Sequence, residues 1–310
     1  MSENGLVGQP VADVIETVVD CEDDDPKRVR EILDPVTDDG VVTRDAVETA
    51  VADTSKVVAT AETRTELAGI AYEDATAAAA TVDDLEIVAA RLDGYADRLD
   101  AVEARAVDLA DDLRTPVEQL DDPAAVYELA MELRDVATTA QGVIRTADDL
   151  SQDLDEFEVW LTDSDRRYDE FAEDIDIIEE SLAELATAAA ALSTASETPA
   201  ADWADATLRV RVMDLLVADL RAELAALRAW ADRVDVQFRT GLTERVADVE
   251  RKTTELRDTL AERAEPVWHD QFDDTISTFE AELDDFEPPV EWNRVQETLE
   301  QRRAQSFDSS

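Results

Sequence analysis

The stretch that decides the fold class runs from residue 126 to residue 161 and reads VYELAMELRDVATTAQGVIRTADDLSQDLDEFEVWL. Its apolar side chains recur at alternating steps of three and four residues, at Val126, Leu129, Leu133, Val136, Ala140, Val143, Ala147, Leu150, Leu154, Phe157 and Leu161. This spacing is the a/d seam of a helix that packs against other helices. It continues to Leu192 and predicts one unbroken helix over residues 123–193, even through Thr162–Asp165, a stretch with the composition of a loop.

Two further segments carry the same periodicity. Residues 44–113 alternate strictly from Leu85 onward and more weakly in their alanine-rich first half. Residues 203–287 keep an apolar face with two irregularities. Three consecutive steps of four, at Val234, Phe238, Leu242 and Val246, form a stutter, which unwinds a supercoil locally. Pro266 kinks or breaks the helix that contains it, because proline cannot donate the helical hydrogen bond.

These patterns predict an all-α protein, an elongated antiparallel three-helix bundle of the spectrin-like or coiled-coil kind. Its long helices cover about residues 44–113, 123–193 and 203–287, and short connections make neighbours antiparallel. Folding the chain at those connections places Trp160 and Trp230 level with Ala75–Ala80. The alternative is a helical hairpin that dimerises into four helices, with the third helix docked elsewhere.

Local signals predict a short-helix cap over residues 1–43 and a short helix with a tail over residues 288–310. Pro26 suits the first position of a helix, and Asp38-Asp39-Gly40 suits a turn. Thr43 is a suitable N-cap for the first long helix, and Asp122 followed by Pro123 suits the start of the second.

The charge balance is strongly acidic. Asp and Glu number 78 against 28 Lys and Arg, which gives a net charge of −50, and lysine occurs only at Lys27, Lys56 and Lys252. This composition resembles that of haloarchaeal proteins, which fold in molar potassium salt. At such salt the Debye length is about 3 Å, so repulsion among surface carboxylates is largely screened. We interpret the acidity as adaptation to that solvent.

Motifs for chemistry are missing from the sequence, so we expect no catalytic residue, no metal site, no cofactor and no enzymatic activity. His269 is the single histidine, and the chain has no glycine-rich phosphate loop and no C-x-x-C pair. Nucleic-acid binding requires the opposite charge. No signal peptide and no apolar run of 18 residues is present, so we expect a cytoplasmic protein without direct membrane insertion.

One segment has more aromatic side chains than a lone helix can bury: Trp268, Phe272, Phe279, Phe286 and Trp292. Either these side chains cover the cap helices, or they form a partner-binding site. They are the only candidate site residues that the sequence offers, and they would bind another protein.

In length, acidity and Ala/Asp/Thr/Glu-rich helical texture, most of the chain resembles the haloarchaeal proteins named halo transducer proteins. It is also loosely similar to the cytoplasmic coiled coil of methyl-accepting transducers, without their kinase-binding tip motif. The resemblance implies a non-enzymatic interaction or scaffold protein with unidentified protein partners, and no residue role is carried over from it. The alternative is a self-assembling coiled-coil rod or filament unit, a homo-oligomer.

Overall fold

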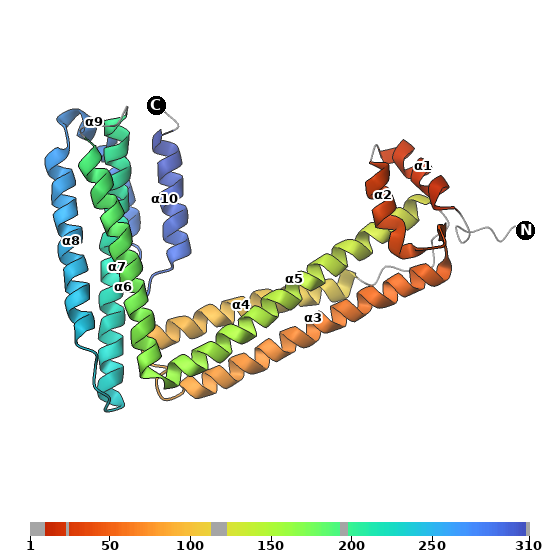
Figure 1. Cartoon of the computed structure of the whole chain (residues 1–310), viewed down its shortest axis with the longest axis horizontal. Helices are drawn as coiled ribbons and strands as arrows, with labels where there is room; N and C mark the ends of the chain where they lie inside the picture. The colour runs from red at the N-terminus through yellow and green to blue at the C-terminus, as the bar shows by residue number, and fades with distance from the viewer. Residues whose placement is uncertain (1–9, 23–24, 113–122, 193–197, 308–310) are drawn as a thin grey trace, which may run out of the picture. The chain divides into compact units, whose positions relative to one another are not determined.

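The computed structural model describes residues 10–22, 25–112, 123–192 and 198–307. Helices make up almost all of these residues, which confirms the all-α class (Figure 1). The chain divides into two compact units. Unit 1 comprises Met1–Ala78 and Leu92–Val159, and unit 2 comprises Ala79–Arg91 and Trp160–Ser310.

Unit 1 is built on the parts of three helices that lie within it: α3 (Arg44–Ala79), α4 (Glu86–Asp112) and α5 (Pro123–Thr162). Consecutive helices run in opposite directions (Figure 1). The seam side chains of α5 are buried, and Leu150 and Leu154 are fully buried. α3 buries alanines such as Ala61 and Ala68 at seam positions.

The cap packs as part of unit 1. It consists of α1 (Val11–Glu22), α2 (Pro26–Leu33), the short helix η1 (Asp34–Val36) and a hairpin of β1 (Thr37–Asp38) and β2 (Val41–Val42). The hairpin turn needs positive φ at both central residues, and Asp39 (49°) and Gly40 (76°) adopt it. The predicted helix starts are confirmed, because Asp25 accepts from Lys27 N and Thr43 accepts from Ala46 N, both at 3.1 Å.

Unit 2 contains α6 (Ser164–Ala191), α7 (Pro199–Arg233), α8 (Gly241–Arg263), α9 (Pro266–Leu283) and α10 (Trp292–Phe307). Its consecutive helices alternate in direction (Figure 1). One continuous apolar core joins all five. The predicted break at Pro266 is confirmed, since α9 begins at that residue.

The prediction of a single helix over residues 44–113 is wrong. α3 ends at Ala79, the chain turns over residues 80–85, and α4 begins at Glu86. Val82 and Leu85 remain buried within the turn. Because α3 and α4 both bury their seam residues, the apolar spacing continues through the turn and does not reveal it.

The prediction that the second helix continues through residues 162–165 is also wrong. Asp163 leaves the helical conformation (φ −105°, ψ 104°), and its carboxylate caps α6 by accepting from Asp165 N at 2.9 Å and Arg166 N at 3.2 Å. Only this one residue separates α5 from α6. Leu161 and Tyr168 therefore both stay buried, and the register looks unbroken.

The third predicted helix, over residues 203–287, is divided as well. α7 ends at Arg233 and α8 begins at Gly241, with positive φ (55°) at Asp235 between them. The stutter at residues 234–246 thus coincides with a full break. The proposed N-cap Asp122 lies outside the described residues, although α5 does begin at Pro123.

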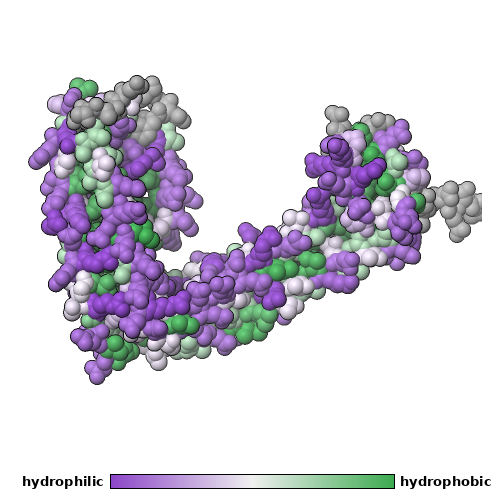
Figure 2. All heavy atoms as spheres, in the orientation of Figure 1, coloured by the Kyte–Doolittle hydropathy of each residue, from purple (hydrophilic) through white to green (hydrophobic). Residues whose placement is uncertain are grey.

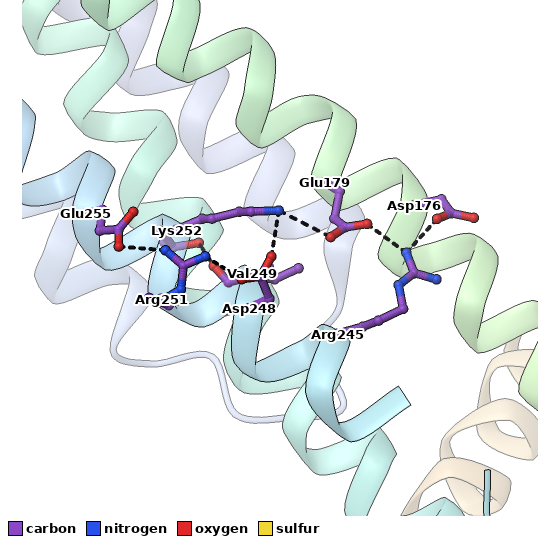
Figure 3. Close-up of polar contacts among 9 residues, drawn as sticks. Asp176, Glu179, Arg245, Asp248, Val249, Arg251, Lys252 and Glu255 are labelled. Atoms are coloured by element: carbon purple, nitrogen blue, oxygen red, sulfur yellow. Dashed lines mark hydrogen bonds and ion pairs between the residues drawn. The ribbon is translucent and has the colours of Figure 1, made fainter. Parts of the chain in front are cut away.

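Ion pairs cover much of the helix surface, and hydrophilic side chains dominate the face in Figure 2. Figure 3 shows a network between α6 and α8 in unit 2. Arg245 contacts Asp176 at 2.5 Å and Glu179 at 2.8 Å, and Lys252 contacts Glu179 at 3.5 Å and Asp248 at 2.7 Å. Among the described residues, no helix is long and apolar enough to cross a membrane.

Candidate functional site

The aromatic side chains singled out by the sequence divide into two groups. Phe272 and Phe279 are buried in the core of unit 2, so they have no surface to offer a partner. Trp268, Phe286 and Trp292 are partly buried against the same core. The suggestion that these aromatics cover the cap is wrong, because the cap core is completed by residues 126–133 of α5.

The partly buried aromatics each have a defined neighbour. Trp292 donates from Nε1 to the Asp219 carboxylate at 2.9 Å. The Trp268 ring lies 6.0 Å from that of Trp203, centroid to centroid. Beside Trp268, Val267 is 67% exposed. The start of α9 thus places two adjacent apolar side chains, the exposed Val267 and the partly buried Trp268, at the surface.

A cavity of about 310 Å³ lies within unit 2, between the first turns of α4, the middle of α7 and the segment before α10. We call it the Glu223 pocket. Apolar and charged side chains line it together: Glu86, Ile87, Ala90, Arg91, Asp219, Ala222, Glu223, Ala226, Pro289, Val290 and Trp292.

Helical spacing on α7 builds one wall of this pocket. Asp219, Ala222, Glu223 and Ala226 fall at positions i, i+3, i+4 and i+7, which share one face of a helix. The neighbouring seam residues, such as Leu220, are buried in the core. Because the two alanines are short, they leave space in front of the two carboxylates.

Arg91, which lines the pocket, contacts side chains of α5 and α6. Its guanidinium contacts Glu170 of α6 at 2.5 Å and lies over the Trp160 ring, 4.1 Å from the ring centroid. Trp160 packs edge-on against Trp230 of α7 at 5.3 Å, so the two tryptophans predicted to share one level are in contact. The guanidinium of Arg167 lies over Trp230. Two arginines therefore enclose a tryptophan pair.

The electrostatics of the pocket concentrate on Glu223. Burial raises the pKa of Glu223 from 4.5 to about 7; Arg91 opposes the shift, and the carboxylates of Asp174 and Asp219 add to it. Burial also raises the pKa of Asp174. It raises the pKa of Asp219 too, against the hydrogen bonds that Asp219 accepts from Trp292 and Val290. Glu223 is therefore a pocket acid whose pKa lies near neutral pH.

Sequence reasoning missed this pocket because its walls come from segments far apart in the chain. Arg91 and Glu223 are separated by more than a hundred residues, and carboxylates are too frequent here for any pair to stand out. The sequence feature that could have indicated the pocket is a pair of acids, Asp219 and Glu223, beside the apolar seam of α7. No group of His, Cys, Asp and Glu in the described parts of the chain has the arrangement of a metal site.

Comparison of the chain with protein-family models, with curated proteins and with solved structures finds no match. Inferences about function therefore rest on the residues of the chain itself.

Proposed function

We propose that this chain is a non-enzymatic cytoplasmic interaction or scaffold protein of a halophilic archaeon, related to the halo transducer proteins. The observation that supports this most is that charged side chains join the helices of unit 2 to one another. Arg91 joins α4 to α6, Arg167 joins the end of α5 to α7, and Asp219 holds the segment before α10 on α7. These contacts fix the helices and give their outer faces a stable shape for a partner.

The charged surface supports the halophilic part of the proposal. The interhelical network of Figure 3 sets a few cations among a larger number of carboxylates. Exposed pairs of this kind each contribute about 0–1 kcal/mol in ordinary buffer. The net charge of −50 must then be screened by solvent ions for the helices to stay packed.

The partner surface of this proposal is the start of α9. Val267 is 67% exposed, and Trp268 beside it is only partly buried. Aromatic side chains such as Trp268 are enriched at the centres of protein interfaces, and Val267 adds exposed apolar area beside it. Phe272 and Phe279 would serve this surface indirectly, by anchoring α9 in the core.

The test is capture of partners from a lysate of a halophilic archaeon in molar KCl, using the full chain. Val267→Glu places a charge in the proposed surface, and Ile177→Glu is the matched control, since Ile177 of α6 is 62% exposed. We expect a specific protein to be captured by the wild type and by Ile177→Glu, and lost with Val267→Glu. Equal capture by all three would contradict the proposed surface. Truncation before α9 is unsuitable, because it would expose the core around Phe279.

The second candidate function, a self-assembling rod, has one observation in its favour. Leu67 and Ile70 on α3 are 46% and 55% exposed and lie one helical turn apart. Sedimentation velocity in molar KCl separates the candidates. An oligomer that dissociates in an Ile70→Glu variant would support the rod, and a monomer at all concentrations would contradict it.

A further inference from the structure

A second cavity of unit 2, of about 470 Å³, lies between α7, α8 and α9. We call it the Arg257 pocket. Its floor is apolar, because Val210, Leu260 and Ile276 line it and are buried in the core. The exposed Ala261 lies at its rim. This size and an apolar floor with a few polar groups around it are the properties of pockets that bind small molecules.

The pocket has an aromatic end and an arginine end. At the aromatic end, the ring of Trp203 lies 5.1 Å from the ring of His269, centroid to centroid. At the arginine end, Arg211 and Arg257 contact the carboxylate of Asp214 at 3.6 Å and 3.3 Å. Trp203 and Arg211 are eight residues apart on α7, which is about 12 Å along a helix. The two ends are thus far enough apart for a ligand to place one group at each.

Arg257 is held less closely than other arginines of unit 2. Its carboxylate partner, Asp214, lies at 3.3 Å and is shared with Arg211. By contrast, Arg239 and Arg245 reach a carboxylate at 2.6 Å and 2.5 Å. Nε and Nη2 of Arg257 have no partner in the described part of the chain, and Nε of Arg211 is buried without a hydrogen-bond partner. In a chain with 78 acids against 28 Lys and Arg, this end of the pocket has hydrogen-bond donors to spare.

Three acids also line the pocket, and two of them are already paired. Glu280 contacts Arg211 at 2.5 Å, and Asp273 contacts Nδ1 of His269 at 2.8 Å. The third, Asp274, is exposed, so solvent screens its charge. The charged group that keeps unpaired donors beside the apolar floor is therefore the guanidinium of Arg257, one helical turn before Leu260 on α8.

We propose that the Arg257 pocket binds a small organic carboxylate with an apolar body. The carboxylate accepts from Nε and Nη2 of Arg257, two parallel donors that match its two oxygens. The apolar body covers Val210, Leu260 and Ile276 and extends toward Trp203. Val267 does not line this pocket, so the ligand site and the proposed partner surface are tested independently.

The experiment is isothermal titration calorimetry of the full chain in molar KCl with three probes that share a phenyl body: phenylpropionate, phenylpropionamide and phenylpropylamine. We expect phenylpropionate to bind at a single site, at least about tenfold more tightly than the other two, because only its carboxylate matches the donors of Arg257. Equal or tighter binding of the amide or the amine would overturn the proposal, and so would the absence of saturable binding of phenylpropionate.

The first pair of variants tests the role of the guanidinium. Arg257→Met keeps an apolar stem and removes the donors, so it should weaken phenylpropionate binding at least about tenfold and leave the weaker binding of phenylpropionamide unchanged. Arg221→Met is the matched control, because Arg221 also joins α7 to α8, through Glu250 at 3.1 Å, but lies outside the pocket. It should change neither affinity. Equal affinities of Arg257→Met and the wild type for phenylpropionate would overturn the proposal.

The second pair of variants tests the place of binding and the sign of the charge. Ala261→Phe keeps both arginines and fills the rim, so it should weaken the binding of phenylpropionate; unchanged binding would place the ligand elsewhere and overturn the proposal. Asp274→Asn should bind phenylpropionate at least as tightly as the wild type, because it removes a like charge. Weaker binding would contradict an anion site. Circular dichroism checks that each variant is folded.

Discussion

The Arg167 guanidinium lies over the ring of Trp230, with its central carbon 4.0 Å from the ring centroid. Arg167 is only 6% exposed, and its Nη1 donates to the carbonyl oxygens of Trp160 at 2.6 Å and Leu161 at 3.0 Å. These carbonyls belong to the last turn of α5, where the break at Asp163 leaves them without helical partners. One side chain thus satisfies the end of one helix and fixes it to another.

Arg167→Lys should destabilise unit 2 by about 2 kcal/mol, because an ammonium cannot serve both carbonyls and also stack flat on an indole. Urea unfolding followed by circular dichroism measures the loss. Arg166→Lys, at the exposed neighbouring position, is the control and should change the free energy of unfolding by less than about 0.5 kcal/mol. An equal effect of the two substitutions would mean that the contact with Trp230 contributes nothing.

Asp163→Ala should cost roughly 0.5–2 kcal/mol, the usual value for loss of a helix N-cap. The carboxylate accepts from two backbone amides at the start of α6, and alanine leaves both without it. Thermal unfolding of the variant is compared with that of Asp155→Ala, an exposed acid within α5. If residues 162–165 were helical throughout, the two substitutions would have similar small effects.

Phe279→Ala should destabilise unit 2 by about 3–5 kcal/mol, because Phe279 is fully buried and its removal leaves a cavity. Phe286→Ala, at a partly buried position of the same aromatic segment, should cost about half as much. Urea unfolding monitored by tryptophan fluorescence checks both. A small effect at Phe279 would reopen its assignment as a partner-binding residue.

Glu223→Gln should stabilise the protein at pH 8 by up to about 3 kcal/mol and have little effect at pH 4. The sign follows from the pKa of Glu223, which folding raises from 4.5 to about 7. A raised pKa contributes stability that is complete below the unfolded value and is lost as pH rises through the folded value. The measurement is the free energy of unfolding from pH 4 to pH 8, wild type minus variant. A difference that does not depend on pH would contradict the burial of this carboxyl group.

Raising KCl from about 0.2 M to about 3 M should raise the midpoint of thermal unfolding by roughly 5 °C or more, because a few kcal/mol of screened repulsion has that effect in a chain of this size. The net charge of −50 is the source of the repulsion. Differential scanning calorimetry gives the midpoints. A midpoint that falls with salt would show that the acidic surface is not an adaptation to salt.

The sequence predicted which residues face the interior far better than where the chain turns. After the turn over residues 80–85, the seam residues Val88 and Leu92 are buried as predicted. Before it, Ala75 is buried as predicted, but Ala79 is buried in place of the predicted Ala78. The turn itself left no clear trace in the spacing. What closes this turn is Arg233 of α7, which contacts Asp84 at 2.5 Å and the Thr81 carbonyl at 3.2 Å. A contact across about 150 residues cannot be read from local periodicity.

The break at Asp163 could have been predicted from sequence composition instead of from the spacing of apolar residues. The loop-like composition of residues 162–165 favoured it, but the unbroken register was preferred; aspartate is also a residue type that helix N-caps favour. A single non-helical residue shifts the register too little to move Leu161 or Tyr168 out of the core. The Glu223 pocket could not be predicted in this way, because carboxylates are frequent throughout the chain and only the structure shows which of them line a pocket between α4 and α7.

The interaction function is tested most directly by photo-cross-linking in living cells of a halophilic archaeon. A benzophenone amino acid is placed at Val267 in one variant and at Ile177 in another, two exposed aliphatic positions of unit 2. We predict a discrete cross-linked product with a different protein from position 267 and none from position 177. No product from position 267, or products formed only with further copies of this chain, would contradict the account.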